Sequence, residues 1–533
     1  MPMKVFASWP AAALAGSIAG HDLDVVQNPH DFTYKVPGLV TWIILGLSVI
    51  GAWAFPRVVV VAATIMALYM LFRFVLVLVF YTIGMLRCRR WATAEFERAP
   101  ASDDLQADDV RHVVLVANYR EPEEVLARTL EALAVQKDAP QRLIVVLAME
   151  EAEEGSRAKA AALQARFAGR FADLLATFHP AGLPGEIRGK GSNLRWAAEE
   201  VRRELVDRQR LPIERLTLTS SDADSLFHPR YFDVVGRLFA ADGQRHLRFW
   251  QAPLLLDTNI WRVPTIIRLF TFMTNAVHLS EQSNAASFPL PLSSFTLSFK
   301  LAEQVGYWDP AVIADDTHIF LRCYFATRGR TRLVPVYLPT RGDTVTGATF
   351  WQTLVNYYKQ KLRHGWGCQD ASYVLQQWGR VDGMSFGRKA LPLIKSLHDH
   401  LIFSVGGGLV LIGTLLSLVL YNNPVITLPF DFAYPLLLQA INVLGALGLW
   451  GTWIAERVRV SSDVRHWRFS TLIMEILGWG AMPVASFLMV GLPVLHAQTK
   501  MMLGSQLAFV PTPKQADPSL PTAPLHSRPR DDA

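Results

Sequence analysis

Long apolar runs at both ends of the chain enclose a charged middle, and this pattern limits the possible folds more than any other feature. Near the N-terminus, Gly38–Ala54 and Val58–Leu86 approach or exceed the roughly 20 residues that cross a bilayer. Asp, Glu, Lys and Arg instead crowd Ala101–Gln360. The chain has 533 residues, of which 51% are hydrophobic, and its mean hydropathy of +0.21 is too high for an ordinary soluble protein of this length. The sequence therefore predicts a soluble domain held between membrane segments.

The apolar runs of the C-terminal part predict further membrane segments. Leu401–Leu420 and Tyr434–Ala455 are long enough to cross. Thr471–Leu495 leaves two alternatives open, because it is long enough to cross once but also contains helix breakers that permit a re-entrant hairpin: Gly478, Gly480 and Pro483.

Arginine clusters beside the apolar runs predict the orientation in the membrane. One cluster follows the second run and the other lies between the last two runs: Arg87, Arg89 and Arg90, and Arg457, Arg459, Arg465 and Arg468. By the positive-inside rule both clusters face the cytoplasm, and so does the charged middle of the chain. The net charge of +6 is mild and these clusters account for its placement, so we expect no nucleic-acid partner.

The charged middle alternates between strand and helix patterns. Three runs predict strands: Val110–Ala117, Leu143–Ala148 and Leu211–Thr219. Two stretches between them predict helices: Glu121–Val135 and Glu151–Phe171. Such alternation is typical of a mostly parallel sheet with crossover helices, so we expect an α/β domain.

Polar clusters directly follow each predicted strand, at the sheet edge where ligands of α/β domains collect. They are Asn118-Tyr119-Arg120-Glu121, Glu150-Glu151 and Asp222-Ala223-Asp224. In extended chain Asp222 and Asp224 would point the same way. Mg²⁺ or Mn²⁺ bridging a diphosphate needs such a carboxylate pair, because these ions prefer oxygen ligands. The alternative is an Asx turn that only ends the strand.

The order of these motifs resembles the membrane-integrated branch of the family-2 glycosyltransferases, which contains cellulose, chitin and hyaluronan synthases. The resemblance covers Val113–Gly367 with the flanking apolar runs, and it implies a GT-A fold. Glu150-Glu151 departs from the family's usual Asp-Asp. The resemblance implies Mg²⁺ or Mn²⁺ on Asp222 and Asp224. It also implies a nucleotide-sugar site formed by Tyr119, Glu121, Glu150, Lys190, Asn193 and Asp222.

The same resemblance assigns the acceptor side of the site. Asp316 matches the family's general base, while the adjacent Asp315 is the second candidate and can instead cap a helix predicted over His318–Phe325. A Gln-x-x-Arg-Trp motif is matched by Gln360 and Arg363, which implies contacts to acceptor and diphosphate. His364 replaces the family's Trp, and Trp366 follows two residues later. This departure weighs against processive polymerisation, and His364 is either a structural or acceptor contact or a metal ligand.

Two further segments concern the membrane surface and the tail. Phe350–Leu362 has an aromatic stripe that suits either the membrane surface or packing on the domain core. The tail from Pro511 is predicted to be disordered. Phe509–Lys514 is similar to a short Thr-x-Lys ending that is cytosolic in the family. A cytosolic tail would require either that Thr471–Leu495 does not cross just once or that the number of spans elsewhere differs from the number predicted.

The expected organisation has six parts: an N-terminal segment (1–37), two transmembrane helices (38–90), a cytosolic GT-A domain (105–349), an interfacial segment (350–395), C-terminal transmembrane helices (396–500) and a cytosolic tail (501–533). The expected function is inverting transfer from a nucleotide sugar, preferably a UDP-sugar, to a polysaccharide or glycan acceptor at the inner face of a bacterial plasma membrane. Membrane lipids are expected partners. Single transfer to a lipid acceptor is the alternative, and a non-catalytic scaffold or transporter subunit is an alternative of another class.

Overall fold

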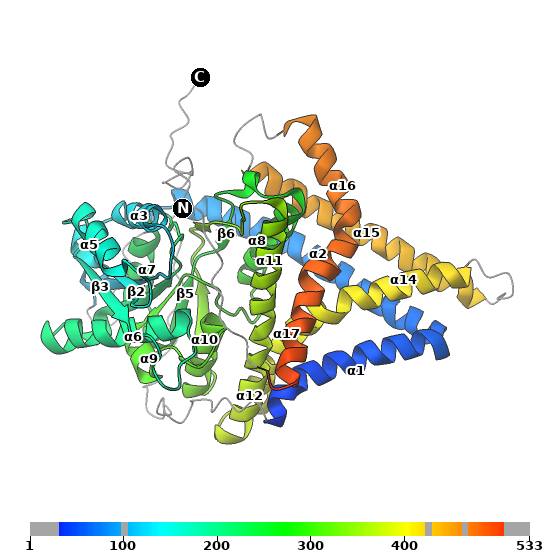
Figure 1. Ribbon diagram of the computed structural model, residues 1–533, viewed down its shortest axis with the longest axis horizontal. Helices are drawn as coiled ribbons and strands as arrows, with labels where there is room; N and C mark the ends of the chain where they lie inside the picture. Colours follow the sequence, from blue (N-terminus) through cyan, green and yellow to red (C-terminus); the bar gives the residue numbers. More distant parts are fainter. Residues whose placement is uncertain (1–30, 97–104, 422–428, 461–466, 506–533) are drawn as a thin grey trace.

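The computed structural model describes residues 31–96, 105–421, 429–460 and 467–505. It shows an α/β domain beside a group of long helices (Figure 1). The predictions for the tail beyond residue 505, including Phe509–Lys514, lie outside the described residues.

The domain is built on a seven-stranded sheet with strand order β3-β2-β1-β4-β7-β5-β8. Among these strands only β7 runs antiparallel to its neighbours, β4 and β5. β6 (Leu254–Leu256) and β9 (Thr340–Gly342) form a separate parallel pair. The predicted mostly parallel α/β sheet is therefore confirmed. The seven strands are β1 (Arg111–Ala117), β2 (Leu143–Glu150), β3 (Asp173–His179), β4 (Leu216–Ser221), β5 (Arg248–Gln251), β7 (Phe295–Ser298) and β8 (Arg332–Pro335).

Helices cover both faces of the sheet, so its central strands are buried on both sides. In β1, Val113 and Leu115 face one apolar core, while Val114 and Val116 face the other. Such strands consist almost entirely of aliphatic residues because neither face meets water. The first core includes α6 (Lys190–Arg202), α9 (Phe299–Gln304) and α10 (Asp315–Ala326). The second includes α3 (Glu123–Ala134), α5 (Ser156–Arg166) and α7 (Tyr231–Ala241).

Some element boundaries differ from the sequence predictions. The strand expected over Leu211–Thr219 begins only at Leu216, because Pro212 lacks an N–H and Ile213–Arg215 forms a 3-10 turn. The strand extends to Ser221, so Asp222 still follows it directly. The helix expected over Glu151–Phe171 is shorter, and the sequence did not predict β3, an edge strand whose half-buried side chains show little alternation.

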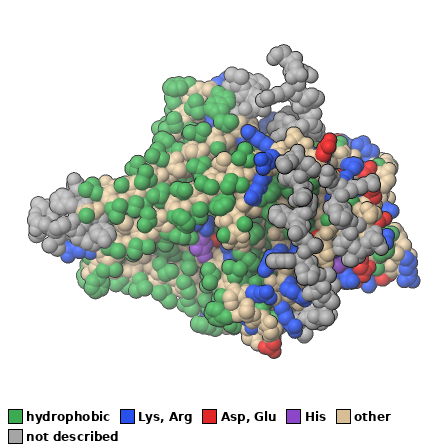
Figure 2. All heavy atoms as spheres, turned by 180° about the vertical axis from the view of Figure 1, so that it is seen from behind, with side chains coloured by type: hydrophobic (Ala, Val, Ile, Leu, Met, Phe, Trp, Pro, Cys, Tyr) green, Lys and Arg blue, Asp and Glu red, His purple; other side chains and the backbone are tan. Residues whose placement is uncertain are grey.

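Five helical stretches are long and apolar enough to cross a membrane, by length and composition. The protein is therefore an integral membrane protein. They are α1 (Phe32–Ala54), α2 (Pro56–Thr93), the α13–α14 run (Phe386–Val419), part of α15 (Pro435–Val460, within Pro429–Val460) and the α16–α17 run (Phe469–Met502). In Figure 2, hydrophobic side chains cover the part formed by these helices, and charged side chains gather over the α/β domain.

The last of these stretches excludes one of the two alternatives that the sequence left open, the re-entrant hairpin. α16 (Phe469–Ser486) continues through a π-helical turn, Phe487–Gly491, into α17 (Leu492–Met502). The chain thus stays helical past Pro483, which lies inside α16, and forms no re-entrant hairpin there.

The aromatic stripe predicted over Phe350–Leu362 lies on α11 (Phe350–Gly365). Thr349 caps this helix by accepting a hydrogen bond from the Gln352 N–H at 3.2 Å. Trp351 is 73% exposed, whereas Tyr357 is buried and stacks on Phe270 of α8 (Thr265–Ser283) with ring centroids 5.6 Å apart. The stripe therefore has one side packed on the protein and one side exposed, and its contact with a membrane surface stays a prediction.

Contacts between the membrane helices and the domain depend on close backbone approach at Gly84 of α2. A Cβ there would lie 2.5 Å from the Ser283 Oγ and 2.7 Å from the Leu279 side chain of α8, whereas a Cβ at Gly46 of α1 would meet nothing within 4 Å.

Gly84→Ala should therefore lower the Tm of the purified protein in detergent, since overpacking costs about 1–3 kcal/mol. Gly46→Ala is the matched control and should leave the Tm unchanged or slightly raised, because Ala favours helix. Equal Tm values for both variants would contradict the observed packing.

Candidate active site

Asp222 and Asp224 follow β4, but the chain turns there instead of staying extended. The Ser225 N–H donates to the Asp222 carbonyl at 3.2 Å, which closes a turn directly after the strand. We expected the chain to be extended here, with both carboxylates on one side, and the turn shows that it is not extended. Asp222 is partly exposed and contacts Lys190, whereas Asp224 is buried and accepts a hydrogen bond from the Asp343 N–H at 3.0 Å.

Lys190, the first residue of α6, joins two carboxylates from distant parts of the chain. Its Nζ lies 2.8 Å from the Asp222 Oδ1 and 3.2 Å from the Asp316 Oδ1. Burial alone would lower the pKa of Lys190, but the charges of Asp222 and Asp316 outweigh this effect and raise the pKa. The side chain is thus an ammonium group that holds the end of β4 and the start of α10 together.

Asp315 and Asp316 form the first turn of α10, which starts earlier than the predicted His318. The N-cap is Ala314, so the proposed capping role of Asp315 is wrong in position, although both carboxylates lie where the helix dipole favours negative charge. Burial and repulsion from Asp316 raise the pKa of Asp315 to about 7. Burial also raises the pKa of Asp316, and Lys190 opposes this shift.

Close packing of α6 on α10 fixes the separation of these groups. A Cβ at Gly191 would lie 3.1 Å from the Asp315 Cβ. Glycine at this position lets the start of α6 approach the start of α10, which places the adjacent Lys190 within reach of Asp316.

Arg363 and His364 of α11 approach the same group of carboxylates. Burial lowers the pKa of Arg363, and the charges of Asp222, Asp315 and Asp316 oppose this shift. Part of the His364 side chain is exposed, but the protein atoms around the imidazole exclude water from much of its environment. This loss of water, together with the cations of Lys361 and Arg363, lowers the pKa of His364 well below its usual range. The imidazole is therefore neutral at pH 7.

Two other residues of the matched motif have different positions. Gln360 precedes Arg363 by three residues on α11 and so shares its side of the helix. Trp366 is not brought to the carboxylates: it is 4% exposed and packs in an apolar cluster with Ile313, Tyr34 and Ala497. Its position is that of a structural residue beneath the loop before α10.

The loop after β1 is fixed by acidic side chains. The Tyr119 N–H donates to the Glu121 carboxylate at 2.6 Å, and the Arg120 N–H donates to Glu153 at 2.8 Å. The Tyr119 ring lies under the guanidinium groups of Arg120 and Arg188, 5.0 and 4.6 Å from its centroid. Tyr119 and Arg120 of this loop thus meet Arg188, which comes from the segment before α6.

Glu150 and Asn193 are buried around the end of β2. The Asn193 amide donates to the Ala148 carbonyl at 2.9 Å, which ties α6 to this strand. Glu150 lies 3.1 Å from the Nδ1 of His179, whose Nε2 lies 2.8 Å from Glu186. Burial alone would lower the pKa of His179, but hydrogen bonds and charges of Glu150 and Glu186 raise it. Glu151 instead is exposed beside Arg157.

Several residues of the site were not found from the sequence. Ser293 donates a hydrogen bond to the Asp222 carboxylate, and Ser225 and Ser294 contact each other at 2.6 Å beneath it. Asp343, which holds Asp224 through its N–H, is paired with Arg128 at 2.5 Å and with Thr258. No motif or spacing marks these residues, because the fold brings them to Asp222 and Asp224 from other elements.

The donor set suits a hard divalent cation, because Asp222 and Asp224 offer only carboxylate oxygens. Within the part of the chain that the structure describes, no group of three or more His, Cys, Asp or Glu side chains is arranged so that it could hold a metal ion by itself. Two protein carboxylates would leave coordination positions open, which suits an ion that also binds phosphate.

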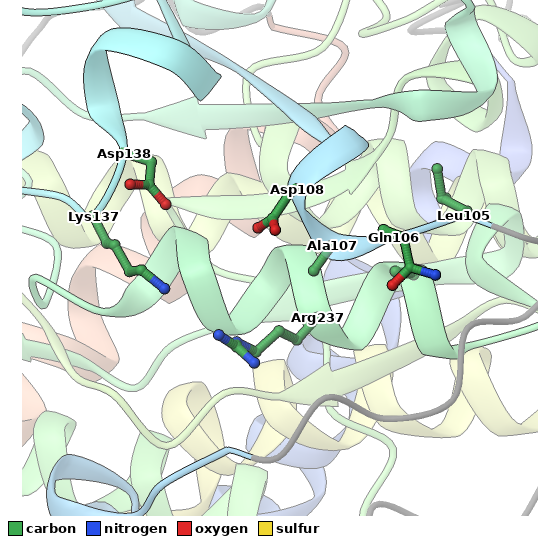
Figure 3. Close-up of a pocket in the computed structure, with 8 residues that line it drawn as sticks. Leu105, Gln106, Ala107, Asp108, Lys137, Asp138 and Arg237 are labelled. Atoms are coloured by element: carbon green, nitrogen blue, oxygen red, sulfur yellow. The ribbon is translucent and has the colours of Figure 1, made fainter.

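A cavity of about 160 Å³ lies away from this site, before β1 and beside α7 (Figure 3). Lys137 and Arg237 line it, and both pair with Asp233, at 3.3 and 3.0 Å. Because these cations already have a carboxylate partner and the cavity lies at the amino end of β1, it is separate from the carboxylate group at the strand ends.

Fold and site together define a membrane-integrated α/β protein with carboxylates and cations gathered at the carboxyl edge of its sheet. Residues 219–495 match the model of glycosyl transferase family group 2, and the chain belongs to this family. The predicted family is thus confirmed. The predicted fold, a GT-A-type α/β domain with long apolar helices on both sides of it in the sequence, is confirmed as well. No curated protein matches the sequence.

Solved structures of glycosyltransferases are similar at low identity. The mannosyltransferase PcManGT from Pyrobaculum calidifontis, in complex with GDP-Man and Mn²⁺, is 14% identical, with a TM-score of 0.42 over 80% of this chain and 98% of that one. S. aureus TarS 1-349, in complex with UDP-GlcNAc, is 11% identical, with a TM-score of 0.36 over 74% of this chain and 93% of that one.

The Arg128–Asp343 pair should be important for both stability and the site. Both side chains are 7% exposed, so Arg128→Met would leave the buried Asp343 carboxylate without an opposite charge, with only the Thr258 hydroxyl as a side-chain partner, at a typical cost of about 3–5 kcal/mol. We expect a clearly lower Tm, together with weaker nucleotide binding because Asp343 holds Asp224. Arg208→Met is the matched control, since the Arg208 side chain is 79% exposed and its pairing with Glu204 contributes little. A Tm equal to that of the control would show that this pair does not stabilise the site.

Proposed function

We propose that the protein transfers a sugar from a nucleotide sugar, preferably a UDP-sugar, to a hydroxyl group of a glycan acceptor, with inversion at the anomeric carbon. The observation that supports this most is Lys190, which joins Asp222 and Asp316 at 2.8 and 3.2 Å. It brings the carboxylate expected on the diphosphate side next to the carboxylate expected on the acceptor side. A transferase needs both groups on opposite sides of one reacting carbon.

The diphosphate side of the reaction would use cationic groups that the structure gathers there. Mg²⁺ or Mn²⁺ on Asp222 and Asp224, when bound, would neutralise charge on the diphosphate and stabilise it as a leaving group. Lys190 and Arg363 lie close enough to Asp222 to bind phosphate oxygens as well. Tyr119, Glu121, Glu150 and Asn193 would shape the nucleoside side of the site.

On the acceptor side, Asp316 would act as the general base. The acceptor oxygen forms a bond to the anomeric carbon while the bond from that carbon to the diphosphate breaks. Asp316 accepts the hydroxyl proton, and the nucleoside diphosphate leaves with the bonding electron pair. The raised pKa of Asp316 brings it nearer the value that suits a base at neutral pH. Gln360, His364 and α11 would position the acceptor.

Two alternatives concern the acceptor and the class of function. Transfer of a single sugar to a lipid acceptor is favoured by His364, which replaces the tryptophan expected in polymerising relatives. A non-catalytic membrane subunit is disfavoured by the complete group of Lys190, Asp222, Asp316 and Arg363. Incubating the purified protein with nucleotide sugars and following nucleoside diphosphate release, with glycan or lipid acceptors in parallel, distinguishes the three.

We further propose that the α/β domain faces the cytoplasm of a bacterial plasma membrane, where nucleotide sugars are made. The arginines at the ends of two membrane helices support this orientation, because they lie on the domain side. Arg87 of α2 donates to Tyr337 at 2.6 Å, and Arg459 of α15 pairs with Asp257 at 2.5 Å.

Metal dependence tests the diphosphate side. Asp224→Asn should abolish turnover and weaken nucleotide binding while the protein still folds, because its amide keeps the acceptor oxygen for the Asp343 N–H but loses the charge that binds the cation. EDTA should stop the wild-type enzyme, and Mg²⁺ or Mn²⁺ should restore it. Full activity in EDTA would overturn the metal assignment.

The two adjacent aspartates give a matched pair for the acceptor side. Loss of a general base costs about 10²–10⁴-fold in rate, so Asp316→Asn should lose turnover by that factor with donor binding retained. Asp315→Asn should keep measurable activity, because Asp315 packs against Gly191, whereas it is Asp316 whose carboxylate lies 3.2 Å from the Lys190 Nζ. The reverse pattern of rates would show that the base is Asp315.

A further inference from the structure

We infer that the α16–α17 run does not cross the membrane but lies along the leaflet next to the α/β domain, with its outer apolar side in contact with lipid acyl chains. The run has 34 residues, Phe469–Met502, and by length and composition it qualifies as a span. At a rise of 1.5 Å per residue it is about 50 Å long, well above the roughly 30 Å of a hydrocarbon core. Its contacts decide between crossing and lying flat.

The first turns of α16 are fixed on the domain side. The Glu475 side chain is fully buried, 2.5 Å from Arg457 of α15 and 3.3 Å from Arg268 of α8. Two residues after Arg457, Arg459 pairs with Asp257, which also pairs with Arg341 of β9 at 2.6 Å. The start of α16 is therefore at the level where the membrane helices meet the sheet.

The first turns of α17 lie along α11, which is itself attached to the domain at both ends. The Asn356 amide donates to the Thr346 carbonyl at 2.9 Å, and beyond the other end Trp366 packs with Ile313. Along this helix, Tyr358 contacts His496 at 3.2 Å, and a Cβ at Gly365 would lie 2.8 Å from the Val494 Cα. α17 therefore runs beside α11 along the domain instead of away from it.

The last turns of α17 return to the domain at a second place. The Cys368 and Met501 sulfur atoms are 3.8 Å apart, and Asp370, two residues after Cys368, accepts a hydrogen bond from Thr317 of α10. A Cβ at Gly38, in the second turn of α1, would lie 2.7 Å from the Gln498 carbonyl oxygen, and Thr33 at the start of the same helix contacts Ser372 at 2.8 Å. Both ends of the run are thus on the side of the α/β domain.

The other long helices point away from the domain. Phe55 joins α1 to α2. In Figure 1 the end of α1 and the start of α2 lie far from the sheet, and α14 (Gly407–Tyr421) and α15 extend in the same direction. In the same view α16 and α17 are drawn steeply across the direction of α1, α14 and α15. Four stretches thus have the direction of crossing helices, and the α16–α17 run does not.

The outer side of α16 is apolar, continuous with the lipid-facing surface of the crossing helices. Seven large apolar residues of α16 and the following π turn are between 37% and 63% exposed: Ile473, Met474, Ile476, Leu477, Val484, Phe487 and Leu488. Glu475 is fully buried and pairs with Arg457 and Arg268 of the protein. An apolar outer side with the charges turned to the protein fits a helix embedded at the surface of a leaflet.

Single cysteines test the topology independently of activity. The native cysteines Cys88, Cys323 and Cys368 are all buried and should not react. Leu503→Cys reports the end of α17, where the side chain is 70% exposed, and Phe55→Cys reports the far turn, where it is 65% exposed. Arg208→Cys reports the domain side.

In sealed vesicles of one orientation, treated with a membrane-impermeant maleimide, Leu503→Cys should label together with Arg208→Cys and opposite to Phe55→Cys. Labelling of Leu503→Cys together with Phe55→Cys would show that the run crosses, and would overturn the inference.

A second measurement avoids dependence on the reactivity of one thiol. An epitope added after Ala533 should be removed by protease from the same side that gives access to Arg208→Cys. Protection from that side, with cleavage only from the side of Phe55, would overturn the inference whatever the labelling of Leu503→Cys. Wild-type protein labelled in detergent shows the background from the buried cysteines.

Discussion

Asp257 connects the membrane helices to the sheet, and much of the arrangement depends on it. It is 3% exposed and pairs with Arg341 of β9 at 2.6 Å and with Arg459 of α15 at 2.5 Å. Burial alone would raise the pKa of Asp257, but these two guanidinium groups lower it, so that it remains a carboxylate. An unpaired charge in this position would be costly, which favours the single arrangement that satisfies all three groups. Two residues after Arg341, Asp343 holds Asp224, so the anchoring contact and the site share one short segment.

The site itself is organised by opposite charges from different elements. Lys190 begins α6, Asp222 follows β4, Asp316 begins α10, and Arg363 comes from α11. The ends of helices and strands converge here because parallel strands end at one edge of the sheet. Membership of glycosyl transferase family group 2 gives this convergence its chemical context.

The sequence predicted what depends on local pattern. β1 and β2 are aliphatic runs, and this pattern predicted two strands of a mostly parallel sheet. The charged middle between apolar runs predicted a domain held between membrane helices. β3 was missed because an edge strand is only partly buried and need not alternate. Residues 190, 222 and 316 were each singled out, yet their contact through Lys190 depends on tertiary structure. Ser293 and Asp343 carry no local signal at all, since only the packed sheet brings them to Asp222 and Asp224.

The direction of β7 has a mechanical consequence. Because β7 is antiparallel to β4, its beginning lies at the edge where β4 ends, and Thr296 is opposite Thr219. The segment that enters β7 therefore supplies Ser293 and Ser294 beside Asp222, and this segment follows α8. α8 is packed on α2 at Gly84 and is reached by Glu475 of α16 through Arg268. Because β7 is reversed, one loop connects α8 to the residues beside Asp222. A displacement of α2 or α16 that moves α8 would therefore be passed to Asp222 through this loop alone.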